Sequence, residues 1–158
     1  MTELLSPIAV RKHLVVDAPC ARAFEVFTAE FDSWWPPSHH IGKADLFAAV
    51  IEPRSGGRWY EKGVDGSECD WGRVLTWEPP HRLVLSWHLN GQWEVDADET
   101  HASEIEVRFT PDGDARTIID FEHRHIERSA FAAQLRDGVD SPQGWTGLLA
   151  LFAAKVKG

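Results

Sequence analysis

Short runs rich in β-branched and aromatic residues occupy the chain between Leu46 and Ile126, and turn signals separate them. These signals are pairs built from glycine, proline, asparagine or aspartate, such as Asp65-Gly66 and Asn90-Gly91, of the kind found in tight turns. The runs cover residues 46–53, 57–64, 69–78, 82–89, 101–110 and 115–126. Successive strands joined by turns this short predict an antiparallel meander, and this feature restricts the fold more than any other.

Alternation of side chains in the last two runs indicates one buried face and one wet face. Charged residues alternate there with apolar ones, and side chains two positions apart share a face of a strand. The apolar set consists of Ile105, Val107 and Phe109 in one run and Ile119, Phe121 and His123 in the next. The sheet is therefore expected to cover a core with this face.

Two short helices are predicted between a first strand and the meander. Residues 8–17 are β-rich, and residues 21–28 show helical spacing of apolar side chains after Ala18-Pro19. A second helical piece over residues 30–35 must end at Pro36-Pro37, because proline disfavours helix at the residue before it and lacks an N–H donor.

The C-terminal segment predicts a long amphipathic helix. Ser141-Pro142 supplies a helix-capping residue and a first-turn proline, and the pattern runs to Lys157. One stripe of this helix carries Trp145, Leu148, Leu149, Phe152 and Val156. These elements together predict a single α+β domain over residues 1–158, in which a curved antiparallel sheet of about seven strands surrounds the last helix. A mostly apolar pocket is expected between sheet and helix.

Composition excludes several classes of partner. The chain has 16 basic and 25 acidic residues, a net charge of −9, and its basic residues are scattered. Nucleic acid is therefore not expected as a partner. No membrane span and no signal peptide is recognised, so a cytoplasmic protein is predicted. Cys20 and Cys69 belong to no paired motif and are interpreted as reduced thiols.

Motifs for specific chemistry are missing from the sequence. Eight histidines show no metal-ligand spacing, and the adjacent His39 and His40 should point in different directions. No catalytic serine or cysteine motif and no phosphate-binding glycine loop occurs, since Gly56-Gly57 leads into a strand. No metal and no cofactor is predicted.

A set of short motifs resembles a known superfamily. In order they are Ala18-Pro19 through Phe27, Trp34-Trp35, Gly56-Gly57-Arg58-Trp59, Gly72-Arg73-Val74, Trp77-Glu78-Pro79-Pro80 and Arg82 through Trp87. Their order and spacing resemble the START-like (SRPBCC) superfamily. Within it they are similar to bacterial proteins that resemble the C-terminal domain of the activator of the heat-shock-protein-90 ATPase. The resemblance covers residues 10–152 and implies a helix-grip fold with an internal cavity, but no fixed catalytic residues.

Tryptophans are the first candidates for ligand contact, because large rings either fill a core or line a cavity. Trp34 and Trp35 precede a proline break and a loop, so they are placed at the pocket mouth, and at least one is expected to be partly exposed. The other aromatic candidates are Trp59, Trp71 and Trp87 on strands and Trp145 and Phe152 on the last helix.

His123 is the first acid/base candidate. Its strand position directs the imidazole toward the core or cavity, where burial lowers the pKa and favours the neutral form. A buried histidine that only hydrogen-bonds a backbone carbonyl is the alternative.

Glu61 is the second acid/base candidate. It shares a face with Trp59, whereas Arg58, Tyr60 and Lys62 share the other, and the sequence does not decide which face is inward. With Trp59 inward, Glu61 lies in an apolar cavity with a raised pKa; alternatively the strand protrudes and both faces are solvated. The same alternatives apply to Arg73, which alternates with Trp71.

Three functions remain open from the sequence. The leading hypothesis is binding of a small hydrophobic or aromatic molecule in the cavity. The second is a cyclase- or dehydratase-like enzyme that uses His123 or Glu61 as acid/base. The third, implied by the resemblance, is a co-chaperone-like activator of the heat-shock-protein-90 ATPase. A homodimer is also possible.

Overall fold

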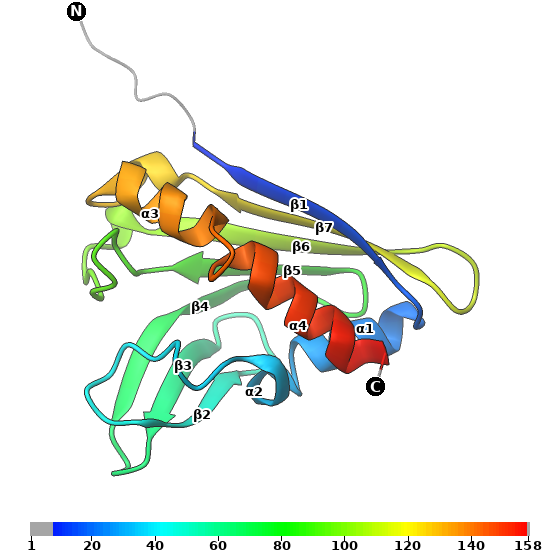
Figure 1. Cartoon of the computed structure of the whole chain (residues 1–158), viewed down its shortest axis with the longest axis horizontal. Coiled ribbons are helices and arrows are strands. Elements are labelled where there is room, and N and C mark those ends of the chain that lie inside the picture. Colours follow the sequence, from blue (N-terminus) through cyan, green and yellow to red (C-terminus); the bar gives the residue numbers. More distant parts are fainter. Residues whose placement is uncertain (1–7, 158) are drawn as a thin grey trace, which may run out of the picture.

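A seven-stranded antiparallel sheet curls around one helix, as shown for residues 8–157 in the computed structural model (Figure 1). The strand order is β1-β7-β6-β5-β4-β3-β2. The strands are β1 (Val10–Val16), β2 (Leu46–Ile51), β3 (Arg58–Gly63), β4 (Glu68–Glu78), β5 (Arg82–Trp87), β6 (Ser103–Pro111) and β7 (Thr117–Arg124). This architecture confirms the predicted helix-grip fold, with the first strand pairing with the last.

In the described part of the chain, four α-helices accompany the sheet: α1 (Cys20–Phe27), α2 (Phe31–Trp34), α3 (Ala132–Asp140) and α4 (Trp145–Lys157). Two single turns of 3-10 helix, η1 (Glu99–His101) and η2 (Ile126–Arg128), flank β6 and β7. None of the helices in residues 8–157 is long and apolar enough to cross a membrane.

The first two helices cover one end of the sheet's inner face. Pro19 precedes α1, which buries Ala23, Phe24 and Phe27. The short α2 is fixed to the edge strand β2, because the Asp32 carboxylate accepts a hydrogen bond from the backbone N–H of Ala49 at 2.9 Å.

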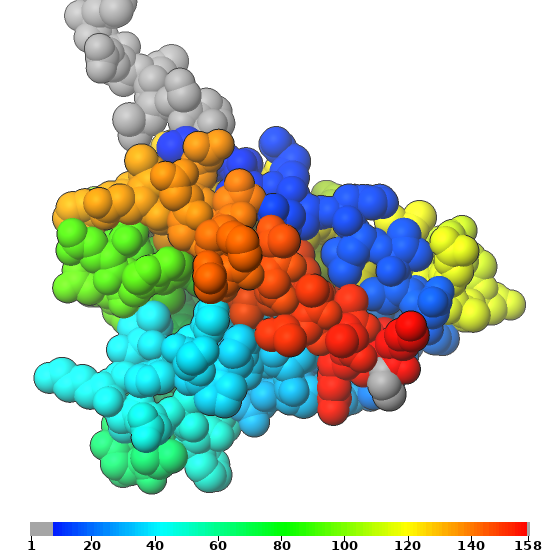
Figure 2. Space-filling model, in the orientation of Figure 1, coloured from blue at the N-terminus to red at the C-terminus, as the bar shows by residue number. Residues whose placement is uncertain are grey.

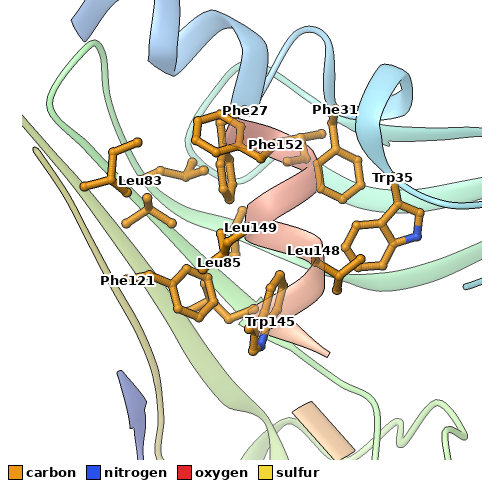
Figure 3. Packing of buried hydrophobic residues seen from close by; sticks show 14 of the residues in the cluster. Phe27, Phe31, Trp35, Leu83, Leu85, Phe121, Trp145, Leu148, Leu149 and Phe152 are labelled. Carbon is orange, nitrogen blue, oxygen red and sulfur yellow. The ribbon is translucent and has the colours of Figure 1, made fainter. Parts of the chain in front are cut away.

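The main core lies between the inner face of the sheet and α4 (Figure 3). The side chains of Trp145, Leu148, Leu149 and Phe152 all point from α4 into this space. At one end Phe152 meets Phe27 edge to face, with ring centroids 5.2 Å apart. At the other end Trp145 packs on Phe121 with centroids 4.6 Å apart. The amphipathic stripe predicted for this helix therefore faces the sheet, as expected.

The start of the last helix was predicted wrongly. Helix α4 begins at Trp145, and Ser141 instead ends α3, where its hydroxyl donates to the carbonyl oxygen of Gly138 at 2.6 Å. The helix over residues 132–140 was not predicted from the sequence. Two buried side chains four residues apart, Leu135 and Val139, hold this helix on the fold.

An irregularity in β4 settles the orientation of Arg73. The pairing of β3 with β4 shifts around Trp71, since Trp59 lies opposite Gly72 but Tyr60 lies opposite Asp70; such a β-bulge breaks the two-residue alternation between Trp71 and Arg73. Trp71 and Val74 are both buried, whereas Arg73 and Leu75 face solvent. Arg73 therefore does not enter the interior.

Candidate functional site

A cavity of about 490 Å³ lies between the sheet and the start of α4. Three chain segments frame it: residues 38–41 after α2, residues 87–93 after β5, and residues 138–148 across the α3–α4 connection. These segments come together on the face shown in Figure 2, in cyan, green and orange respectively. Volumes of roughly 300–1,000 Å³ are typical of small-molecule sites.

Indole rings form much of the cavity wall. Trp35, Trp71, Trp87 and Trp145 all line it. Ring centroids lie 5.3 Å apart for Trp35 and Trp71, 5.8 Å apart for Trp87 and Trp145, and 6.2 Å apart for Trp35 and Trp145. Each ring thus supports another in tilted or edge-to-face contact, which holds the wall in one arrangement.

In three of these indoles the N–H group, the only hydrogen-bond donor of the ring, is bonded to another group of the protein. The Nε1 of Trp35 donates to the carbonyl oxygen of His39 at 3.0 Å. The Nε1 of Trp71 donates to Glu61 at 2.9 Å, and that of Trp145 donates to His123 at 3.0 Å. The rings that they anchor therefore offer the cavity carbon surface and not hydrogen-bond donors.

Trp93 is a wall residue that the sequence analysis did not single out. It lies in the connection after β5, lines the cavity and is 44% exposed. Its backbone adopts a left-handed conformation with a φ of 61°. Its ring packs beside Gly138 of α3, where an added Cβ would approach Trp93 Cζ2 to 2.7 Å. The Asn90-Gly91 turn signal marked this connection as a turn but gave no hint that it reaches the cavity.

His123 is fully buried and does not line the cavity. Desolvation lowers its pKa to about 3, so the ring is neutral. Its Nδ1 accepts from Trp145, and its Nε2 lies 2.8 Å from the Ser103 hydroxyl. Its orientation toward the interior agrees with the strand alternation. The alternative of a buried histidine bonded to a backbone carbonyl is not what the structure shows, since both partners of His123 are side chains.

Glu61 is also inside the protein and is 1% exposed. The structure thus places Trp59 and Glu61 on the inward face of β3. On the opposite face, the Arg58 guanidinium covers Tyr60 at 3.9 Å from the ring centroid. Glu61 does not itself line the cavity but lies behind Trp71.

One oxygen of Glu61 collects three donors. Besides Trp71 Nε1, its Oε1 accepts from the backbone N–H groups of Ile41 at 2.5 Å and Gly42 at 3.0 Å. These amides belong to the segment at the cavity mouth. Glu61 therefore fixes a wall residue and a mouth segment at the same time.

The remaining candidates from the sequence are core residues. Trp34, Trp59 and Phe152 are buried and do not line the cavity. The expectation that Trp34 or Trp35 is partly exposed is wrong, since they are only 4% and 6% exposed. Trp34 donates to the carbonyl oxygen of Val26, and Trp35 stacks on Phe31 with centroids 4.9 Å apart.

His39 and His40 lie at the cavity mouth. From the sequence they were considered only as possible metal ligands. His39 Nε2 donates to the carbonyl oxygen of Gln143 at 2.7 Å, and its Nδ1 lies 3.1 Å from the Ser38 hydroxyl. His40 Nδ1 donates to the carbonyl oxygen of Gly42 at 2.8 Å. Between residues 8 and 157, no group of three or more His, Cys, Asp or Glu side chains is arranged to hold a metal ion.

A curved sheet that grips a C-terminal helix and encloses a side cavity defines the START-like class of proteins. Residues 17–157 match the family model described as activator of Hsp90 ATPase homolog 1-like protein. The chain belongs to this family. The comparison with curated proteins gives no match.

Two solved structures are similar to the chain in both sequence and fold. One is the anthrahydroquino-γ-pyrone synthase Txn09, with 41% identity over 92% of this chain and 95% of that one and a TM-score of 0.65. The other is CalC from Micromonospora echinospora, described as a self-sacrificing resistance protein. It shares 33% identity over 94% of each chain, with a TM-score of 0.69.

Proposed function

We propose that the chain binds a planar, mostly apolar aromatic molecule in the tryptophan-lined cavity. The observation that carries this proposal is the wall of four buried indoles, three of which direct their N–H groups into protein hydrogen bonds. Such a wall favours flat rings, which gain from stacking as well as from burial. It offers no comparable gain to a saturated molecule of the same size.

One of the two named relatives, Txn09, supports the same class of molecule. Txn09 is by its description a synthase of an anthrahydroquino-γ-pyrone, whose name denotes fused aromatic rings, and it is 41% identical to this chain. The relation also favours an enzyme of the cyclase type as a second candidate function. Glu61 and His123 do not border the cavity, so this proposal assigns them no acid/base role.

Titration of intrinsic tryptophan fluorescence with anthraquinone tests the proposal. Anthraquinone should quench the emission in a saturable manner, and its fully hydrogenated analogue should bind much more weakly. The variant Trp87→Leu should weaken anthraquinone binding about five- to tenfold, the equivalent of about one aromatic contact. Trp77→Leu is the matched control, since Trp77 packs on Phe24 and does not line the cavity.

No saturable binding of anthraquinone, or equal loss in both variants, would overturn the proposal. The co-chaperone function stays a prediction that rests on the family name. It requires retention of the ninety-kilodalton heat-shock chaperone in a pull-down and stimulation of its ATPase activity.

A further inference from the structure

His40 presents an unused hydrogen-bond acceptor at the cavity. Its Nδ1 bonds to the carbonyl oxygen of Gly42, and because a carbonyl only accepts, Nδ1 carries the proton in the neutral ring. The Nε2 atom is then a bare acceptor. Within residues 8–157 no group donates to it, and His40 is a half-buried residue of the cavity lining.

Other polar side chains of the lining are either engaged or exposed, except that of Trp87, whose buried indole N–H is a donor with no partner among residues 8–157. His39 uses both ring nitrogens, with Gln143 and Ser38 as partners, and the Ser141 hydroxyl donates to Gly138. The side chains of Gln143 and Trp93 are exposed. His40 Nε2 is thus distinguished from its neighbours, including the adjacent histidine.

A hydrogen bond to Gly42, which is itself hydrogen-bonded to Glu61, holds His40 in position. Gly42, whose carbonyl oxygen holds His40 Nδ1, donates its own N–H to the buried Glu61 carboxylate. Ile41, between them in sequence, donates to the same oxygen. A buried carboxylate, two backbone amides and a carbonyl therefore fix the imidazole, so its acceptor is preorganised for a ligand.

We infer that the aromatic molecule carries a hydroxyl group, and that this hydroxyl donates its hydrogen bond to His40 Nε2. The inference rests on the proposed function and narrows its ligand to a hydroxylated arene. Rings stack against the indoles, while the hydroxyl meets His40 Nε2, a side-chain acceptor of the lining to which no described residue donates. Glu61 is a positioning residue in this arrangement.

Calorimetric titration with β-naphthol and with its methyl ether tests the inference. The two probes share their rings, but only the naphthol can donate. The natural chain should bind the naphthol about fivefold more tightly than the ether, as expected for one hydrogen bond. In His40→Asn the amide replaces Nδ1 but nothing replaces Nε2, so this preference should disappear.

Two further variants control for disturbance of the mouth. His40→Gln places an amide oxygen near the position of Nε2 and should keep part of the preference. His39→Asn should keep the full ratio of the two affinities, even where both affinities change, because His39 has no free acceptor.

The outcomes separate the inference from the proposed function. Failure of both probes to bind removes the proposed function and the inference with it. Equal binding of the two probes by the natural chain, or an unchanged ratio in His40→Asn, overturns only the inference and leaves an apolar aromatic site.

Discussion

Trp145 donates its indole N–H to Nδ1 of His123 across 3.0 Å, and both side chains are buried. Because the indole nitrogen only donates, Nδ1 must be the acceptor, and the proton of the neutral ring lies on Nε2. Nε2 in turn donates to the Ser103 hydroxyl at 2.8 Å. This bond joins the first residue of α4, which lines the cavity, to strand β7.

Replacement of two tryptophans by phenylalanine should separate this bond from ring packing. Trp145→Phe removes the donor and leaves a buried nitrogen of His123 without a partner, whereas Trp87 Nε1 has no partner among residues 8–157. Trp145→Phe should lower the free energy of unfolding by about 1–3 kcal/mol more than Trp87→Phe, the cost of an orphaned acceptor. Urea denaturation measures the difference, and equal losses would contradict the argument.

The buried His123 should make the fold sensitive to acid. Its pKa is about 3 in the folded chain, whereas an unperturbed histidine, as in the unfolded chain, has a pKa of 6.5. Below pH 6.5 the unfolded state therefore binds a proton that the folded state does not bind. Stability is therefore retained above pH 6.5 and falls as the pH drops toward 3, by at most about 1.4 kcal/mol per pH unit.

The variant His123→Asn provides the comparison for this pH effect, since its amide oxygen can still accept from Trp145. Urea unfolding between about pH 7 and about pH 4 should show a shallower decline for the variant than for the natural chain. Parallel curves would show that the imidazole does not titrate on unfolding in the expected way.

Removal of the Glu61 carboxylate should loosen the cavity mouth. Glu61→Ala strands the Trp71 N–H and the amides of Ile41 and Gly42, and it should lower the free energy of unfolding by about 2 kcal/mol. Hydrogen exchange at these two amides should accelerate. Glu68→Ala is the control: this exposed carboxylate pairs with Arg58 at the surface, and its loss should change little.

Gly138→Ala should displace Trp93 without harm to the helix. Alanine is favoured over glycine inside α3 by up to about 1 kcal/mol, but its Cβ would meet the Trp93 ring at 2.7 Å. Trp93 is half-exposed and free to swing away, so thermal stability should hold or rise while the affinity for aromatic probes changes. In a Trp93→Ala background the same substitution should no longer alter affinity, and a change that persists there would rule out this contact as the cause.

Strand alternation made the sheet predictable. Each meander run carries its own turn signals, and the parity of Ile105 or Phe121 depends only on local backbone geometry. Alternation also directed Trp87 inward, and the stripe of the last helix directed Trp145 inward, to the space where the cavity lies; for Trp71 alternation left the orientation open. Local patterns fail where packing overrides them, as at Ser141, which has the features of a helix start but ends the preceding helix.

Local sequence patterns could not predict which residues lie at the cavity mouth. Trp93 reaches the cavity through a left-handed backbone position and contact with α3. His40 gains its role from a bond to Gly42 and from a carboxylate on a strand some twenty positions away. Such placements depend on contacts between segments distant in sequence, which neither spacing nor composition records.

The hydrogen bonds of the wall indoles divide the cavity into two parts that can change independently. Three tryptophans are hydrogen-bonded to strand β7, strand β3 and the segment after α2, so their replacement would disturb the fold itself. Gln143 and Trp93, in contrast, lie on connecting segments with exposed side chains. Substitutions at such exposed positions can therefore change which molecules the cavity accepts. The hydrogen-bonded tryptophans can stay the same while ligand specificity changes.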